Sequence, residues 1–231
     1  MSTLVLRLSA PVQSWAGYRA SYRSVATFPT PTKSGIAGLL GACVGITDYM
    51  SLIPLFDLWV RADKINPFSS DFQVSSATKT AEHKSFSRAI SLATAKNTKA
   101  PTFLDGKAGR LSDRDFLPHS EFMCALEGES DLVESWLHAC KSPIFMPYLG
   151  RRGNAPSFPF LLGVTEESAR NILEVLPRVP RHDEKEPKPT RLHHVIGTYE
   201  YHETETFSID VPAESREEQL TWASKNLRRI S

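Results

Sequence analysis

Cysteine is scarce in this sequence, with three in 231 residues. Cys43, Cys124 and Cys140 lie far apart and form neither a CxxC pair nor a Cys/His ligand spacing. Disulfide frameworks and zinc sites need such spacings, so the pattern argues against both. We expect reduced thiols packed as small core residues, in a cytoplasmic protein without a bound metal.

Long hydrophobic runs are also missing. The longest uncharged apolar run, Gly35 to Ile46, is shorter than the roughly 20 residues that span a bilayer. The N-terminal run contains Arg7 and no small-residue cleavage site follows it, which excludes a secretion signal. We therefore expect a soluble protein with no membrane partner.

The common signatures of catalysis and cofactor binding are absent as well. Lys33, Ser34 and Gly35 lack the preceding glycines of a Walker A loop. In GIAGLLG the glycines recur inside a predicted helix and not in the turn before it, which excludes a dinucleotide fingerprint. No HExxH, GxSxG or kinase motif occurs. None of these templates selects a catalytic residue, and we expect no cofactor.

Acidic residues are absent from the first 47 positions, and the charges of the chain are segregated. Residues 1–47, 72–114 and 135–165 carry net charges of +4, +5 and +3, which leaves −11 for the rest of a chain whose total is +1. If these three basic blocks meet in space, they form a surface for a polyanion. If they are scattered, each is an ordinary solvated face.

The hydrophobic pattern predicts elements in the order strand, helix, strand, strand, helix, strand. This order is the split βαβ pattern of a ferredoxin-like domain in an α+β protein. The predicted strands are residues 3–10, 57–65, 119–128 and 157–164, and the predicted helices are residues 34–46 and 130–141. A further helix is expected between an N-cap at Thr165 and Pro177.

We place the ferredoxin-like, RNA-binding domain at residues 1–177, with an insert at about 72–118 between its second and third strands. The insert is rich in Ser, Thr, Ala and Lys, and so long a loop within a domain is usually functional or disordered. Residues 178–231 are expected to form a charged, proline-rich connector and a smaller strand-rich part, because HHVIGTYEYHETETFSIDV alternates with a period of two.

The stretch FPTPTKSGIAGLLGACVGI predicts a helix with small residues along one side. Small side chains at 35, 38, 41, 42 and 45 would let it approach the sheet or a neighbouring backbone closely. Its larger side chains would fill the core, namely Ile36, Leu39, Leu40, Cys43 and Val44. A helix N-terminus also attracts anions, so Thr32, Lys33 and Ser34 lie where a phosphate could be held.

A second distinctive stretch is PYLGRRGNAPSFP, in which Arg151 and Arg152 stand between glycines. Prolines fix the shape of this loop, and guanidiniums and backbone amides can approach an anion together there. We favour an anion-binding loop over the alternative, a charged surface turn that serves solubility.

Four stretches occur together in a specific order and spacing: LVLRLSAPVQSWAG, FPTPTKSGIAGLLGACVGI, EFMCALEG and PYLGRRGNAPSFPFLLG. In this arrangement they resemble the CRISPR-associated CasD family, the fifth Cas protein type, whose members are subunits of the type I-E Cascade complex in the RAMP superfamily. The resemblance covers residues 3–165 well. It is weak in the C-terminal third. The insert agrees with the family in position and basic character more than in amino-acid identity.

The resemblance implies a ferredoxin-like, RRM-type body from which the insert projects as a long β-hairpin thumb. It also implies a non-catalytic, RNA-binding subunit of a ribonucleoprotein complex in antiviral defence, one that binds and caps the 5′ handle of the CRISPR RNA. Its expected partners are that RNA, the backbone and large subunits of Cascade, and target DNA near the guide duplex.

Single-stranded RNA held in a shaped path needs cations for its phosphates and aromatic platforms for its bases. We predict such residues after the first strand, at the start of the glycine-rich helix, in the insert and in the arginine loop. They are Trp15, Tyr18, Arg19, Tyr22, Arg23, Thr32, Lys33, Ser34, Arg88, Lys107, Arg110, Arg151 and Arg152.

The alternative is a metal-independent endoribonuclease that processes CRISPR repeat RNA, as type I-C relatives do. Such an enzyme needs a base, a cation and a positioned 2′-hydroxyl. Tyr22, Lys33 and one of the seven histidines could supply a set, but no spacing selects it.

Overall fold

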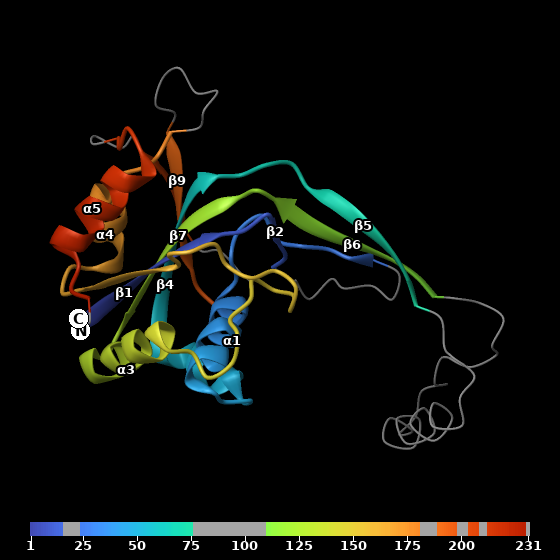
Figure 1. The fold of residues 1–231 in the computed structure, drawn as a ribbon, viewed down its shortest axis with the longest axis horizontal. Coiled ribbons are helices and arrows are strands. Elements are labelled where there is room, and N and C mark those ends of the chain that lie inside the picture. Colours follow the sequence, from blue (N-terminus) through green and yellow to red (C-terminus); the bar gives the residue numbers. More distant parts are fainter. Residues whose placement is uncertain (16–23, 76–109, 181–188, 198–202, 208–211, 230–231) are drawn as a thin grey trace.

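The computed structural model describes residues 1–15, 24–75, 110–180, 189–197, 203–207 and 212–229 (Figure 1). Its main sheet has the strand order β10-β9-β4-β7-β1-β8, and each neighbouring pair is antiparallel. The strands are β1 (Ser2–Ser9), β4 (Phe56–Lys64), β7 (Glu121–Gly128), β8 (Leu161–Thr165), β9 (Thr190–Val195) and β10 (Glu203–Phe207).

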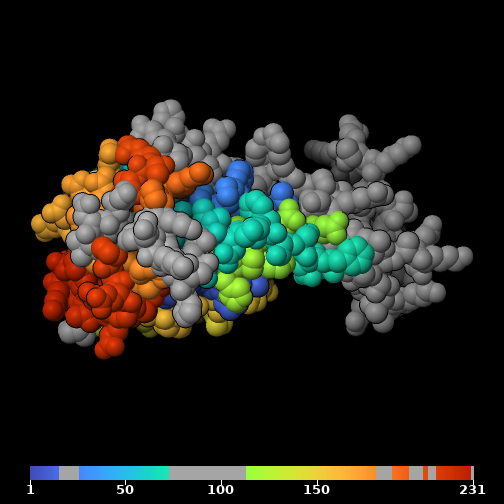
Figure 2. Space-filling view, turned by 90° about the horizontal axis from the view of Figure 1, so that it is seen from above, coloured from blue at the N-terminus to red at the C-terminus, as the bar shows by residue number. Residues whose placement is uncertain are grey.

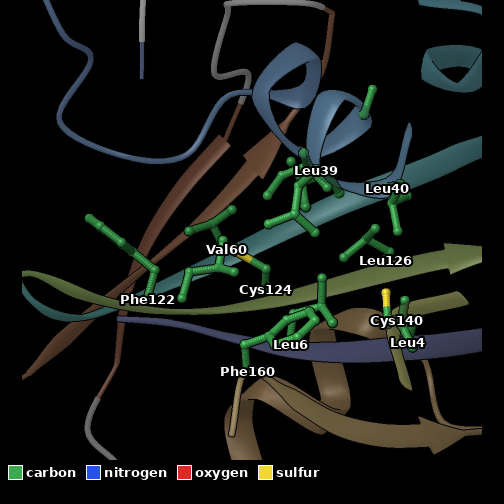
Figure 3. Close-up of a cluster of buried hydrophobic side chains, with 14 of the residues drawn as sticks. Leu4, Leu6, Leu39, Leu40, Val60, Phe122, Cys124, Leu126, Cys140 and Phe160 are labelled. Carbon is green, nitrogen blue, oxygen red and sulfur yellow. The ribbon is translucent and has the colours of Figure 1, made fainter. Parts of the chain in front are cut away.

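Helices α1 (Lys33–Val44) and α3 (Ser130–Lys141) cover one face of this sheet. Alternate side chains of each strand point towards them, because successive residues of a strand face opposite sides. Figure 3 shows the resulting core, in which Leu4 and Leu6 of β1 and Cys124 of β7 pack with Leu39 of α1. All three cysteines are free thiols buried in this core, as predicted.

Helices α4 (Ala169–Val175) and α5 (Arg216–Asn226) lie on the opposite face. There the intervening strand residues, such as Val5 and Met123, form a second core with Leu173 and Leu227. The sheet is therefore covered on both sides, and β1 is buried along almost its whole length.

The predicted order of elements is confirmed, because β1, α1, β4, β7, α3 and β8 follow one another along the chain. The helix predicted from Thr165 begins only at Ala169, since the Ser168 side chain supplies the N-cap and accepts a hydrogen bond from the Asn171 amide. The last predicted strand, 157–164, is confined to β8.

Strands β9 and β10 extend the main sheet, because β9 pairs with β4 and β10 pairs with β9. The division predicted at residue 177 therefore does not coincide with a boundary between sheets. Helix α5 follows and was not predicted. Only Gln219 and Ala223 are buried within it, so its apolar periodicity is weak.

Strands β5 (Ser69–Ser75) and β6 (Arg110–Pro118) form an antiparallel arm that leaves the body on the side away from α5 (Figures 1 and 2). The register runs from Ser69 opposite Phe116 to Ser75 opposite Arg110. The other side of β6 pairs with two short strands, β2 (Val12–Gln13) and β3 (Ser24–Val25). The expected hairpin insert thus has two paired strands at its base, and residues 76–109 lie outside the described part of the chain.

Helix α1 begins at the predicted place because the Thr32 hydroxyl accepts a hydrogen bond from the Gly35 amide at 3.2 Å. It ends at Gly45, whose φ of 86° is left-handed. The predicted core side chains of this helix are buried, apart from the partly buried Val44.

The glycines of α1 allow close packing, but their nearest neighbours are not in the sheet. A Cβ atom added to Gly35 would lie 2.7 Å from the Trp15 ring. One added to Gly41 would lie 2.7 Å from the Cβ atom of Tyr49, in the short 3-10 helix η1 (Tyr49–Leu55). Among the described residues no single helix is long and apolar enough to cross a bilayer, although α1 and η1 together pass that test across a 115° bend.

Candidate nucleic-acid interface

The arginine loop, the segment after β1 and the arm meet at one place. The Ser14 amide donates a hydrogen bond to the Leu149 carbonyl at 3.1 Å, and the Ser14 hydroxyl donates to the Asp115 carbonyl at 3.3 Å. Arg151 donates from Nη2 to the same Asp115 carbonyl at 3.2 Å. We call this place the arm junction and define it as Ser14, Arg114, Asp115 and residues 149–154.

The loop at the junction has a fixed shape. The Leu149 amide donates to the Asn154 carbonyl at 2.8 Å, and the Asn154 amide donates to the Arg151 carbonyl at 2.9 Å. Gly150 has a φ of 88°, and a Cβ atom there would lie 1.5 Å from the Ser14 carbonyl oxygen. Only glycine fits this position, so the loop can lie directly against the segment after β1.

The junction brings together segments of all three basic blocks but cations of only two. Arg114 belongs to the second block and Arg151 to the third, and their charges interact. The first block contributes Ser14, whereas its described cations lie elsewhere, Arg7 bonded to Glu121 and Lys33 over the Phe56 ring.

The electrostatics of the junction favour an anion. Partial burial lowers the pKa of Arg151, and repulsion from the nearby Arg114 lowers it further, while Asp71 and Asp115 act in the opposite direction. Arg152 lies beside them and is exposed. A desolvated cation held next to another cation is typical of an anion site.

Trp15 does not have the predicted role of an aromatic platform in this structure. Its side chain is only 1% exposed and packs on Gly35 of α1. Its ring face is therefore part of the core and not available to a base. Large aromatic side chains bury much apolar area, and in this chain that tendency decided the position of Trp15.

The predicted phosphate site at the start of α1 is largely engaged within the protein. Thr32 is buried and caps the helix. The Lys33 ammonium lies 5.3 Å from the centroid of the Phe56 ring, a cation–π geometry, and burial lowers its pKa while Asp57 opposes that effect. Ser34 is half-buried, with its hydroxyl 3.4 Å from that of Thr32.

The remaining predicted RNA-binding residues cannot be placed at the junction. Arg110 is the first residue of β6, and its side chain is not described. Those outside the described residues are Tyr18, Arg19, Tyr22, Arg23, Arg88 and Lys107. Within the described ranges, no three His, Cys, Asp or Glu side chains gather as metal ligands.

Arg114 is a cation of the junction that is not among the predicted RNA-binding residues. It stands between two acids in SDRDF, so its charge looks locally neutralised. Period-two alternation along 110–118 would have placed Arg110, Arg114 and Phe116 on one face of a strand, apart from Asp113 and Asp115. That alternation was the available signal.

Comparison with known proteins agrees with this architecture. A family model described as CRISPR-associated protein (Cas_Cas5) matches residues 3–223. The CRISPR system Cascade subunit CasD of Escherichia coli (strain K12) is 30% identical over 172 residues, which cover 72% of this chain and 73% of that protein.

Two solved structures are also similar. A chain of a CRISPR RNA-guided surveillance complex matches with a TM-score of 0.71 at 21% identity, covering 97% of this chain and 100% of that chain. A crystal structure of a Cas protein matches with a TM-score of 0.60 at 26% identity, covering 91% and 97%. The resemblance seen in the sequence motifs is thus confirmed over nearly the whole length, and the chain belongs to the CRISPR-associated protein (Cas_Cas5) family.

Proposed function

We propose that this protein is a non-catalytic subunit of a type I-E CRISPR surveillance complex, and that it binds and caps the 5′ handle of the CRISPR RNA. Its family and its similarity to a Cascade subunit support its place in such a complex. The observation that carries RNA binding is the arm junction, where Arg114 and Arg151, cations of two basic blocks, lie beside the segment after β1.

The body of the protein is ferredoxin-like in this proposal. The strand order β4-β7-β1-β8 supports it, because a ferredoxin-like βαββαβ unit places its first and third strands in the middle. Helix α1 connects β1 to β4, and α3 connects β7 to β8. The arm of β5 and β6 would then be the base of the thumb, inserted between the second and third strands of the unit.

RNA is expected at the junction and not on the main sheet. RRM domains stack bases on an open sheet face. Here α1 and α3 cover one face and α4 and α5 cover the other, so neither is open to bases. The junction instead offers guanidinium donors beside a rigid loop, a geometry that suits phosphate oxygens.

The partners in this proposal are the CRISPR RNA, the neighbouring backbone subunit, the large subunit and target DNA near the guide duplex. The protein would work in the cytoplasm as part of a ribonucleoprotein that recognises foreign DNA. Buried free thiols are consistent with a reducing compartment.

Incubating the purified protein with labelled repeat-derived RNA in the presence of a chelator tests the proposal. We expect a salt-dependent complex and no cleavage product, because binding by phosphate contacts releases counterions. An RNA of equal length without the handle is the matched control and should bind more weakly.

The same assay separates the alternative function. A discrete product that disappears after a His→Ala substitution would identify a metal-independent endoribonuclease and contradict the non-catalytic role. Failure of the protein to bind the handle RNA at low salt would contradict RNA binding itself.

A further inference from the structure

We propose that Arg114 and Arg151 act together as a clamp for a single phosphate group of the RNA. This inference rests on the proposed RNA-binding function and names the side chains that would hold the phosphate. It differs from the pairing suggested by the sequence, in which Arg151 works with its neighbour Arg152.

Arg151 is held in place by one of its hydrogen bonds. Its Nη2 donates to the Asp115 carbonyl at 3.2 Å, so the guanidinium is tied to the middle of β6. A guanidinium has five N–H donors. Within the described residues, no other hydrogen bond of the Arg151 side chain to the protein is found, so the remaining donors are free to meet an acceptor.

Arg114 supplies a donor that lacks an acceptor. It occupies the middle of β6, with Asp71 of β5 opposite it on one side and Val25 of β3 on the other. Its Nε atom is buried, and among the described residues no hydrogen-bond partner accepts from it. An unsatisfied buried donor costs free energy, and a bound anion would remove that cost.

The two guanidiniums also repel each other. Arg114 contributes to lowering the pKa of Arg151, after the larger effect of burial, and Asp71 and Asp115 offset this only in part. An RNA phosphate placed between the two cations would replace repulsion by attraction. Its two charged oxygens can accept hydrogen bonds from both guanidiniums at once.

Binding of the repeat RNA by single and double variants tests the clamp. We expect Arg114→Ala and Arg151→Ala each to raise the dissociation constant about tenfold, and the double variant to raise it by little more than either alone, because both remove one shared contact. Arg170→Ala, which removes an exposed arginine of α4 that pairs with Glu174 and Glu205, is the control and should change it by less than about threefold. Arg114→Gln keeps a polar side chain in β6 if Arg114→Ala folds poorly.

The clamp would be overturned if the effects of Arg114→Ala and Arg151→Ala on the dissociation constant multiplied as independent effects do. It would also be overturned if Arg170→Ala weakened binding as much as either of them. Inorganic phosphate gives a second readout that does not depend on RNA. Compared with chloride at equal ionic strength, it should raise the melting temperature of the unaltered protein by roughly 2–4 °C and that of either arginine variant by less. If the protein fails to bind RNA, the proposed function is wrong. The effect of inorganic phosphate on the melting temperature then still tests whether Arg114 and Arg151 hold a phosphate together.

Discussion

Gly150 has a left-handed backbone conformation and lies against the backbone of Ser14 at the junction. Its φ is 88°, and a Cβ atom would lie 1.5 Å from the Ser14 carbonyl oxygen. We expect Gly150→Ala to lower the free energy of unfolding by about 3 kcal/mol or more, because strain and a backbone clash add. Urea denaturation followed by circular dichroism measures this.

Two other glycines are matched controls for that prediction. Gly197 has a φ of 69° with no atom within 4 Å of an added Cβ, so Gly197→Ala should cost only the strain, about 1–2 kcal/mol. Gly153 has neither feature, and Gly153→Ala should stay within about 0.5 kcal/mol. Equal losses at Gly150 and Gly197 would show that the contact with Ser14 does not matter.

Single residues were the hardest feature to predict from the sequence. The arginine loop was recognised from its composition, and Arg151 does lie at the junction. Its neighbour Arg114 was not recognised, and Trp15 was assigned to RNA although it is buried. The two errors have different causes. Trp15 is buried because it packs against α1, which its neighbours in the chain do not show, whereas the alternation along 110–118 was a local signal for Arg114.

At the scale of elements, two glycines of α1 differ in the space that is available for a side chain. An added Cβ at Gly38 would meet the Tyr49 ring at 3.8 Å, an ordinary contact, whereas at Gly41 it would lie 2.7 Å from the Tyr49 Cβ atom. We expect Gly38→Ala to stabilise the protein by about 0.5–1 kcal/mol through helix propensity. Gly41→Ala should destabilise it by about 1–3 kcal/mol, because η1 must move.

Thermal or urea unfolding of the two variants compares positions three residues apart on the same helix. Changes of the same sign would contradict the packing described for η1. A stabilised Gly41→Ala variant in particular would mean that Tyr49 moves aside at little cost.

Arg61 of β4 forms a buried ion pair within its own strand and hydrogen bonds to helix α4. Arg61 is fully buried, bonds both carboxylate oxygens of Asp63 at 2.6 and 2.9 Å, and donates to the carbonyls of Leu173 and Leu176 at the end of α4. Burial raises the pKa of Asp63 in spite of Arg61, so the carboxylate depends on this partner. We expect Arg61→Met to destabilise the protein by about 3–5 kcal/mol.

The Asp63→Asn substitution tests the reason for that loss. If an unpaired buried carboxylate is the main cost, the Arg61→Met, Asp63→Asn double variant should be more stable than Arg61→Met alone. Urea unfolding of the four proteins in this cycle gives the coupling energy. Additive effects would show that the carbonyl contacts to α4, and not the ion pair, dominate.

For the whole molecule, the C-terminal residues complete the fold. Leu192 of β9 and Ala223 of α5 belong to the second core, and Val164 of β8 exchanges both backbone hydrogen bonds with Arg228. We expect a chain ending at residue 177 to lose cooperative unfolding and to bind the dye ANS, because it loses α5 and β9 and so exposes the part of the second core that they cover.

Adding residues 178–231 as a separate chain is the control for that truncation and should reduce dye binding. A chain of residues 1–177 that melts cooperatively near the temperature of the full protein would contradict the prediction. It would mean that the first 177 residues are a domain in their own right.

The sequence by itself determined the order of the central elements and the start of α1. Hydrophobic periodicity and helix capping are local patterns, so they can be recognised within a few residues of sequence. The motifs also determined the family, since long stretches in a specific order leave little room for chance.

Only the tertiary structure decided where the elements of the site meet. Ser14 and Arg151 bond the same carbonyl of Asp115 across 101 and 36 positions of sequence, and no local pattern encodes such a meeting. It likewise decided that β9 joins β4 and that α4 and α5 cover the sheet, because those contacts follow from burying apolar faces against each other. A charge pattern shows that cations are present, and packing determines which of them stand together.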